Sequence, residues 1–243
     1  MISIKKHIPN SITCLNLLCG CFACMFAFKG YVNAQYVYVA AMLMCAAAIF
    51  DFMDGFAARL LKAYSPMGKE LDSLADLISF GFAPGIISMQ IANMIISPAK
   101  TDWWWEILPY IAFLIPVFAG LRLAKFNIDD RQTTSFLGLP VPANALFWIG
   151  FYTMVAKYEW MECIYFWIAM VLLFSYMMVS ELPMFSLKFA NLKLKDNYLR
   201  FILIIGTLFF VLYLGFAGFA PTILFYILLS IIQNIISKKQ GVK

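Results

Sequence analysis

Charged side chains are scarce in this sequence: its 243 residues include 18 basic and 13 acidic ones, 13% in total. Soluble domains carry roughly 25% charged residues, whereas 63% of this chain is hydrophobic. This composition excludes a water-soluble enzyme, a disordered chain and a separate soluble domain of ordinary size. The net charge of +5 comes without a basic stripe, so nothing in the sequence favours a nucleic-acid partner.

Histidine is almost absent, since His7 is the only one in the sequence. It precedes the first apolar run, so we expect neither a Ser-His-Asp nor a Cys-His catalytic arrangement. Four of the six cysteines fall within the first apolar run, where cysteine behaves as a small apolar residue. They therefore do not predict a disulfide framework.

The apolar runs are long enough for a membrane protein, because a transmembrane helix needs about 20 mostly apolar residues. Bounded by charges and turn residues, they predict an all-α, polytopic membrane helix bundle with about eight transmembrane helices. We expect one integral membrane domain over residues 1–243, with a catalytic six-helix core over about 1–180. Residues 181–243 would add a cytoplasmic loop and two further helices. The predicted spans lie near Ile8–Phe28, Tyr31–Phe50 (extended to about Leu61), Leu71–Ile96, Trp105–Leu121, Val141–Ala156, Cys163–Ser180, Phe201–Phe216 and Thr222–Ile236.

The distribution of basic residues predicts the orientation. With the N-terminus in the cytoplasm, 15 of the 18 basic residues fall on cytoplasmic segments, and Lys29, Lys100 and Lys157 fall outside. The positive-inside rule then predicts both termini in the cytoplasm and an even number of spans. The run from Trp103 to Trp105 would lie on the outer side, where indoles favour the lipid headgroup region.

Acidic residues interrupt the apolar sequence in two places. Asp51, Asp54, Gly55, Ala58 and Arg59 have the spacing i, i+3, i+4, i+7 and i+8, which is one stripe of an α-helix. A lone aspartate in mid-membrane costs about 2.5–3.5 kcal/mol, so these carboxylates require a compensating charge.

A second acidic stripe follows a short turn. Gly68, Asp72 and Asp76 have the spacing i, i+4 and i+8, and two antiparallel helices can bring both stripes together. The four aspartates would then form a cluster beside Arg59 that suits two Mg²⁺ or Mn²⁺ ions, because these ions prefer oxygen ligands. The alternative is a salt-bridge network with Arg59, Lys62 and Lys69, for which too few cations lie on the right faces.

The whole string, Asp51-x2-Asp54-Gly55-x2-Ala58-Arg59-x8-Gly68-x3-Asp72-x3-Asp76, resembles the signature of the CDP-alcohol phosphotransferase family at all eight positions. Softer matches over roughly the first 145 residues look like the phosphatidylserine synthases of bacteria and archaea. They lie at Ile8–Thr13 with Asn16 and Gly20, at Ser79–Pro84, at Arg122–Asn127 and at Phe136–Ala143.

The resemblance implies a role for individual residues. Asp51, Asp54 and Asp72 would be metal ligands, and Asp76 would both touch metal and accept the proton of the acceptor hydroxyl. The residues implied to contact the donor, CDP-diacylglycerol, are Asn10, Thr13, Gly55, Arg59 and Ser65.

The implied reaction moves the phosphatidyl group from CDP-diacylglycerol to L-serine and releases CMP. The expected setting is a homodimer among membrane lipids, in a prokaryotic cytoplasmic membrane with the active site on the cytoplasmic side. The carboxylate of serine needs a cation. Arg122, Lys125 and Arg131 are candidates on a cytoplasmic loop, although ordinary positive-inside charge explains each of them equally well.

Two alternatives remain from the sequence. One is another phosphatidyltransferase of the same family, such as phosphatidylglycerophosphate synthase, whose phosphorylated acceptor would demand more cations around the site. The other is an ion-coupled transporter with intramembrane aspartates as its binding site. A transporter would place these carboxylates near the midplane and repeat them in a second half, whereas here they gather near a helix end without a repeat.

Overall fold

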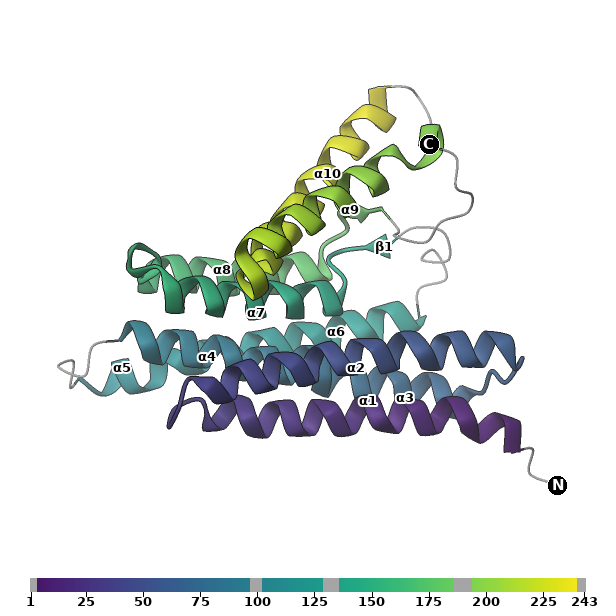
Figure 1. The fold of residues 1–243 in the computed structure, drawn as a ribbon, viewed down its shortest axis with the longest axis horizontal. Coiled ribbons are helices and arrows are strands. Elements are labelled where there is room, and N and C mark those ends of the chain that lie inside the picture. Colours follow the sequence, from purple (N-terminus) through teal and green to yellow (C-terminus); the bar gives the residue numbers. More distant parts are fainter. Residues whose placement is uncertain (1–3, 97–101, 129–135, 186–193, 240–243) are drawn as a thin grey trace.

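The computed structural model describes residues 4–96, 102–128, 136–185 and 194–239, and their fold is a helix bundle (Figure 1). The predicted all-α class is confirmed, with one short pair of strands. The elements in chain order are α1 (Ile4–Lys29), α2 (Gln35–Leu60), α3 (Pro66–Asp76), the π-helical turn η1 (Leu77–Phe82), α4 (Ala83–Ile95), α5 (Trp103–Ile107), the 3₁₀ turn η2 (Leu108–Phe113), α6 (Leu114–Ile128), β1 (Phe136–Leu137), α7 (Val141–Lys157), η4 (Glu159–Met161), α8 (Ile164–Val179), β2 (Pro183–Met184), α9 (Leu194–Leu214), η5 (Gly215–Gly218) and α10 (Phe219–Lys239).

Five helical stretches in the described residues are long and apolar enough to cross a membrane, so the predicted count of about eight spans is not confirmed. They are His7–Lys29, Gln35–Leu60, Pro66–Ile95, Trp103–Ile128 and Asn197–Ile236. Helices α7 and α8 have 17 and 16 residues. At 1.5 Å per residue each is about 25 Å long, which is less than the hydrocarbon core of roughly 30 Å.

The last of the five stretches reverses direction, and Figure 1 shows α9 and α10 lying side by side and inclined to the other helices. The turn lies at Gly215, which has a positive φ of 63°. A Cβ atom added to Gly218 would lie 2.3 Å from the carbonyl oxygen of Phe210, so the two helices meet closely just after the turn. The two C-terminal helices predicted from the sequence are therefore present as one hairpin.

The stretch Pro66–Ile95 forms the centre of the bundle. Its most apolar part is 72% buried, against 17–33% for the corresponding parts of the other four stretches. Polar side chains tie it to its neighbours: the Trp167 indole of α8 donates to the Ser88 carbonyl at 3.0 Å, and the Gln90 amide donates to the Ala27 carbonyl of α1 at 3.1 Å. This central stretch carries two of the four aspartates.

The outward faces of the other helices are apolar. Large side chains such as Leu18 on α1, Phe52 on α2 and Phe209 on α9 are 50%, 68% and 64% exposed. In water such a surface would be costly, whereas lipid tails cover it at no cost. The apolar surface thus agrees with a bundle embedded in lipid.

The turn between α2 and α3 is defined by local capping. Lys62 adopts a left-handed φ of 49°, and the amide of Ala63 donates to the carbonyl of Ala58, so α2 ends there. Ser65 then caps α3 by accepting a 3.0 Å hydrogen bond from the amide of Gly68, with Pro66 in the first turn. This cap explains why the third helix begins at Pro66, within the turn predicted before Gly68 and ahead of the apolar span predicted from Leu71. We call this end of the bundle the site end.

At the same end a two-stranded sheet and a hydrogen bond join β1, β2 and α10. β1 pairs antiparallel with β2, and β2 is connected to α10, because the Asn234 amide donates to the Pro183 carbonyl at 2.6 Å. Gly138 directly follows β1 with a φ of +77°. A Cβ atom there would lie 2.5 Å from the carbonyl oxygen of Met178, so only glycine fits this approach to the end of α8.

The substitution Gly138→Ala is expected to destabilise the protein by more than the roughly 1–2 kcal/mol of left-handed strain alone, since the methyl group also meets the Met178 carbonyl. Gly215→Ala is the matched control, because Gly215 has a similar φ of 63° and nothing within 4 Å of the added Cβ. Thermal unfolding in detergent measures both. Equal losses in the two variants would contradict the proposed close approach at Gly138.

Candidate functional site

Three carboxylates converge at the site end. Asp51 near the end of α2 and both Asp72 and Asp76 of α3 each place one carboxylate oxygen so that all three oxygens lie within 4.8 Å of one another. Asp51 and Asp72 are also within hydrogen-bonding reach. The helix-turn-helix of α2 and α3 thus brings together the two acidic stripes, as the spacing predicts.

The remaining aspartate of the motif, Asp54, faces α1. It is 5% exposed, and its Oδ2 accepts a 2.6 Å hydrogen bond from the Thr13 hydroxyl. It does not belong to the group of three converging oxygens. Asp54 as a fourth metal ligand stays a prediction.

A cavity of about 510 Å³ opens between α1, α2 and α3. This volume lies within the range of roughly 300–1,000 Å³ found for ligand pockets. Asp72 belongs to both the cavity wall and the three-carboxylate group. The lining consists of Pro9, Asn10, Thr13, Asp54, Gly55, Ala58, Ala63, Tyr64, Ser65, Pro66, Gly68, Lys69 and Asp72.

Four of the five residues predicted to contact the donor line this cavity: Asn10, Thr13, Gly55 and Ser65. The fifth, Arg59, is exposed beside it, and its Nη1 lies 3.7 Å from the place where a Cβ atom of Gly55 would be. Gly68 permits the close approach of α1 and α3, because a Cβ atom there would lie 2.9 Å from Oδ1 of Asn10. Lys69, which was not predicted to contact the donor, adds a cation to the wall.

Two of the three candidates for binding the acceptor, Arg122 and Lys125, lie on helix α6 and not on a loop as predicted. Arg122 is 6% exposed, its Nε donates to the carbonyl of Leu139 at 2.9 Å, and its charge interacts with that of Asp76. Arg131 lies outside the described residues. Arg122 therefore connects the segment before α7 with the surroundings of the carboxylates.

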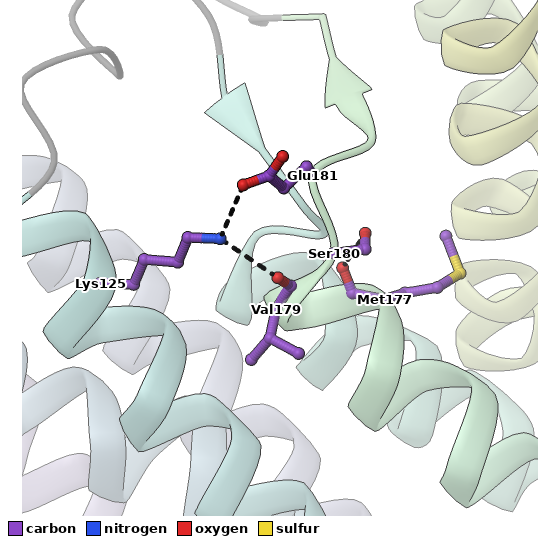
Figure 2. A network of polar contacts seen from close by, with 5 residues as sticks. All are labelled: Lys125, Met177, Val179, Ser180 and Glu181. Atoms are coloured by element: carbon purple, nitrogen blue, oxygen red, sulfur yellow. Dashed lines mark hydrogen bonds and ion pairs between the residues drawn. The ribbon is translucent and has the colours of Figure 1, made fainter.

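Lys125 has a different environment, shown in Figure 2. Its Nζ lies 3.7 Å from the Glu181 carboxylate and 3.5 Å from the Val179 carbonyl at the end of α8. A cation at a helix C-terminus also interacts favourably with the helix dipole. Through these contacts Lys125 joins α6 to the end of α8.

Two buried polar residues beside Asp76 received no individual role from the sequence. Asn16 of α1 donates from Nδ2 to Oδ1 of Asp76 at 3.3 Å, and the Ser79 hydroxyl donates to Oδ1 of Asn16 at 2.7 Å. Both side chains are completely buried. Their position within apolar helices could have indicated this contact from the sequence, because a buried polar side chain requires a hydrogen-bond partner.

A sequence model described as CDP-alcohol phosphatidyltransferase matches residues 6–175, which is well over half of the chain. The chain belongs to the CDP-alcohol phosphatidyltransferase family. The resemblance stated from the acidic motif is thereby confirmed. Membership of this enzyme family, together with the five apolar helical stretches, favours an integral membrane enzyme over the ion-coupled transporter.

Similar curated proteins carry the name CDP-diacylglycerol–serine O-phosphatidyltransferase. The relative from Mycobacterium leprae is 33% identical over 73% of this chain and 57% of its own length. The relative from Bacillus subtilis is 36% identical over 56% of this chain and 70% of its own length. The relative from Helicobacter pylori is 30% identical over 81% of this chain and 78% of its own length. The chain thus spans a little over half the length of the mycobacterial relative.

The geometry of the three converging carboxylates suits a divalent metal ion. Oδ1 of Asp72 is buried without a hydrogen-bond partner among the described residues, so one acceptor in the group remains open. Like charges this close repel one another in a medium of low dielectric constant, and a divalent cation removes that repulsion. The fit holds for Mg²⁺ and Mn²⁺, both of which prefer oxygen ligands.

Added Mn²⁺ is expected to stabilise the protein by about 2.7 kcal/mol at a concentration 100 times its dissociation constant, and Asp72→Asn is expected to remove this gain. Thermal unfolding in detergent with and without Mn²⁺ measures the effect. Glu70→Gln is the control, because Glu70 is an exposed carboxylate in the same helix. An unchanged Mn²⁺ response in Asp72→Asn would contradict the assignment.

Proposed function

We propose that this protein transfers the phosphatidyl group of CDP-diacylglycerol to L-serine, giving phosphatidylserine and CMP. The observation that carries the proposal is that Asp72 is shared by the cavity and the three-carboxylate group. A ligand in the cavity therefore has its charged part next to the carboxylates. The names of the similar proteins from three bacteria supply the acceptor.

The cavity suits the nucleotide part of the donor. Gly55 lines it without a side chain, and a Cβ atom there would have only Nη1 of Arg59 within 4 Å, so a flat or phosphorylated group can approach the backbone. Asn10, Thr13 and Ser65 offer polar groups to the nucleotide, and the Arg59 guanidinium beside the cavity can form two parallel hydrogen bonds with a phosphate. The acyl chains would stay in lipid along the apolar outer surface.

The proposed metal ligands are Asp51, Asp54, Asp72 and Asp76, holding two divalent ions, Mg²⁺ or Mn²⁺. When bound, such ions supply charge neutralisation of the donor diphosphate and of the departing phosphate. The residues themselves provide four acceptor groups on two helices, fixed by the Ser65 cap and the turn at Lys62.

Asp76 is the proposed general base. The serine hydroxyl oxygen forms a bond with the phosphorus attached to diacylglycerol, the bond from that phosphorus to the bridging oxygen breaks, and CMP leaves with that oxygen. Asp76 takes the hydroxyl proton, which is the role that a carboxylate within hydrogen-bonding distance of the acceptor can fill. Arg59 holds the phosphate oxygens during the displacement.

Arg122 is the preferred partner for the serine carboxylate. It is buried, its charge interacts with that of Asp76, and its Nε donates to the carbonyl of Leu139. A guanidinium can still bind a carboxylate through its remaining N–H groups. Lys125 was predicted for the same role, but its contacts with Glu181 and Val179 favour the structural one.

The proposed setting is the cytoplasmic membrane of a prokaryote, with the site end and both termini in the cytoplasm. The distribution of basic residues in the sequence supports this orientation. Helix α5, with the exposed Trp103 and Trp104, lies at the end of the bundle away from the α2–α3 turn, where the outer headgroup region would be (Figure 1). A homodimer is part of the proposal and rests on the family resemblance.

The experiment supplies the purified full chain with CDP-diacylglycerol, Mg²⁺ or Mn²⁺, and one acceptor at a time: L-serine, glycerol 3-phosphate or inositol phosphate. We expect CMP release and a new lipid with L-serine. Asp76→Asn should lower turnover by a factor on the order of 10²–10⁴, as loss of a general base does, while Glu70→Gln retains it.

Product with glycerol 3-phosphate alone would retain the family and contradict serine as the acceptor, in favour of a phosphatidylglycerophosphate synthase. Near-normal turnover in Asp76→Asn would contradict the proposed base for any acceptor.

A further inference from the structure

The carboxylate of Asp76 accepts a hydrogen bond from a neighbouring helix. Asn16 projects from α1 and reaches Oδ1 of Asp76 with its amide nitrogen at 3.3 Å. Asn16 is 0% exposed, so water does not compete for this contact. One of the two carboxylate oxygens therefore has a fixed donor.

A second contact fixes the orientation of the Asn16 amide. The Ser79 hydroxyl lies 2.7 Å from Oδ1 of Asn16 and 3.1 Å from the backbone carbonyl of the same residue. A hydroxyl has one proton, and the shorter contact is the better donor geometry. With Oδ1 of Asn16 accepting from Ser79, its NH₂ group must face Asp76. The chain Ser79 to Asn16 to Asp76 therefore has one consistent direction of donation.

The backbones of η1 and α1 approach each other closely at this contact. Ser79 lies in the π-helical turn η1, which follows Asp76 immediately, and such turns often occur at functional sites. Gly20 lies one turn beyond Asn16 on α1, and a Cβ atom there would be 2.2 Å from the Ser79 hydroxyl and 2.9 Å from its Cα. Only glycine lets α1 come this close to η1.

We propose that Asn16 and Ser79 are positioning residues for Asp76: they occupy its Oδ1 and turn its other oxygen toward Asp51 and Asp72. The inference rests on the proposed function, in which Asp76 binds a cation together with Asp51 and Asp72. Partners that orient a metal-binding side chain usually contribute about 10–100-fold to metal affinity or activity.

The test uses the purified full chain in detergent and measures Mn²⁺ binding by electron paramagnetic resonance, together with kcat and KM for CDP-diacylglycerol. Asn16→Leu should weaken Mn²⁺ binding and lower kcat by about 10–100-fold each. The KM should change by less than about twofold, because Asn16 does not line the donor cavity. Ser79→Ala should change the same quantities in the same direction by a smaller factor.

Two matched controls lie on the same central stretch. Gln90→Leu removes a buried amide that also joins α4 to α1, through the carbonyls of Ala27 and Phe28. Ser88→Ala removes a buried hydroxyl that accepts from the Trp167 indole. Fourteen residues of helix, roughly 20 Å, separate Gln90 from Asp76. Both controls should lower thermal stability and leave Mn²⁺ affinity and kcat unchanged.

Wild-type Mn²⁺ affinity in Asn16→Leu would overturn the inference, as would equal losses in Gln90→Leu. If Asn16→Leu does not fold, Ser79→Ala decides by the same readouts. A wild-type protein that binds no Mn²⁺ contradicts the metal site of the proposed function as well. A wild-type protein that binds Mn²⁺ while Asn16→Leu binds it equally contradicts this inference alone.

Discussion

Mutual repulsion among carboxylates inside an apolar helix bundle is the constraint on which the rest of this structure depends. Asp51, Asp72 and Asp76 bring oxygens within 4.8 Å of one another, inside a bundle whose outer helices carry exposed apolar side chains. In such surroundings unit charges interact far more strongly than in water. A divalent cation bound among the carboxylates would remove this repulsion. Such a site agrees with the family to which the chain belongs.

The scaffold around the carboxylates uses small residues and caps rather than additional charge. Gly20 and Gly68 let α1 approach the central stretch, where Cβ atoms would lie 2.2 Å from Ser79 and 2.9 Å from Asn10. Ser65 fixes the first turn of α3. Close backbone approach is a common means of helix association in membranes, where the hydrophobic effect does not drive helices together. The same approach here also brings polar side chains of α1 to the aspartates.

Much of this arrangement is predictable from the sequence, because helical periodicity is local. The spacing of Asp51 and Asp54 on one helix, and of Asp72 and Asp76 on the next, was sufficient to predict that the two stripes meet. The apolar runs were sufficient to predict helices in all eight places, although five stretches in the described residues meet the length of a span. The lengths of α7 and α8 depend on tertiary packing and on where each cap forms, which the run of apolar residues does not specify.

Contacts between distant segments could not be predicted in the same way. Asn16 and Asp76 are 60 residues apart, and Lys125 and Glu181 are 56 apart. Neither pairing leaves a periodic signal, so the contact of Lys125 with the end of α8 was not predicted, and its role in acceptor binding stays a prediction. The 2.6 Å hydrogen bond from the Thr13 hydroxyl of α1 to Oδ2 of Asp54 is a further contact that helical periodicity does not predict, and Asp54 as a metal ligand stays a prediction.

The most direct test of the central claim is the position of the cation itself. Crystals of the full chain grown from lipid with Mn²⁺ would be measured for anomalous diffraction. The account predicts an anomalous peak about 2.1 Å from carboxylate oxygens of Asp51, Asp72 and Asp76. A peak at other residues, or a carboxylate group without a peak at saturating Mn²⁺, would contradict it.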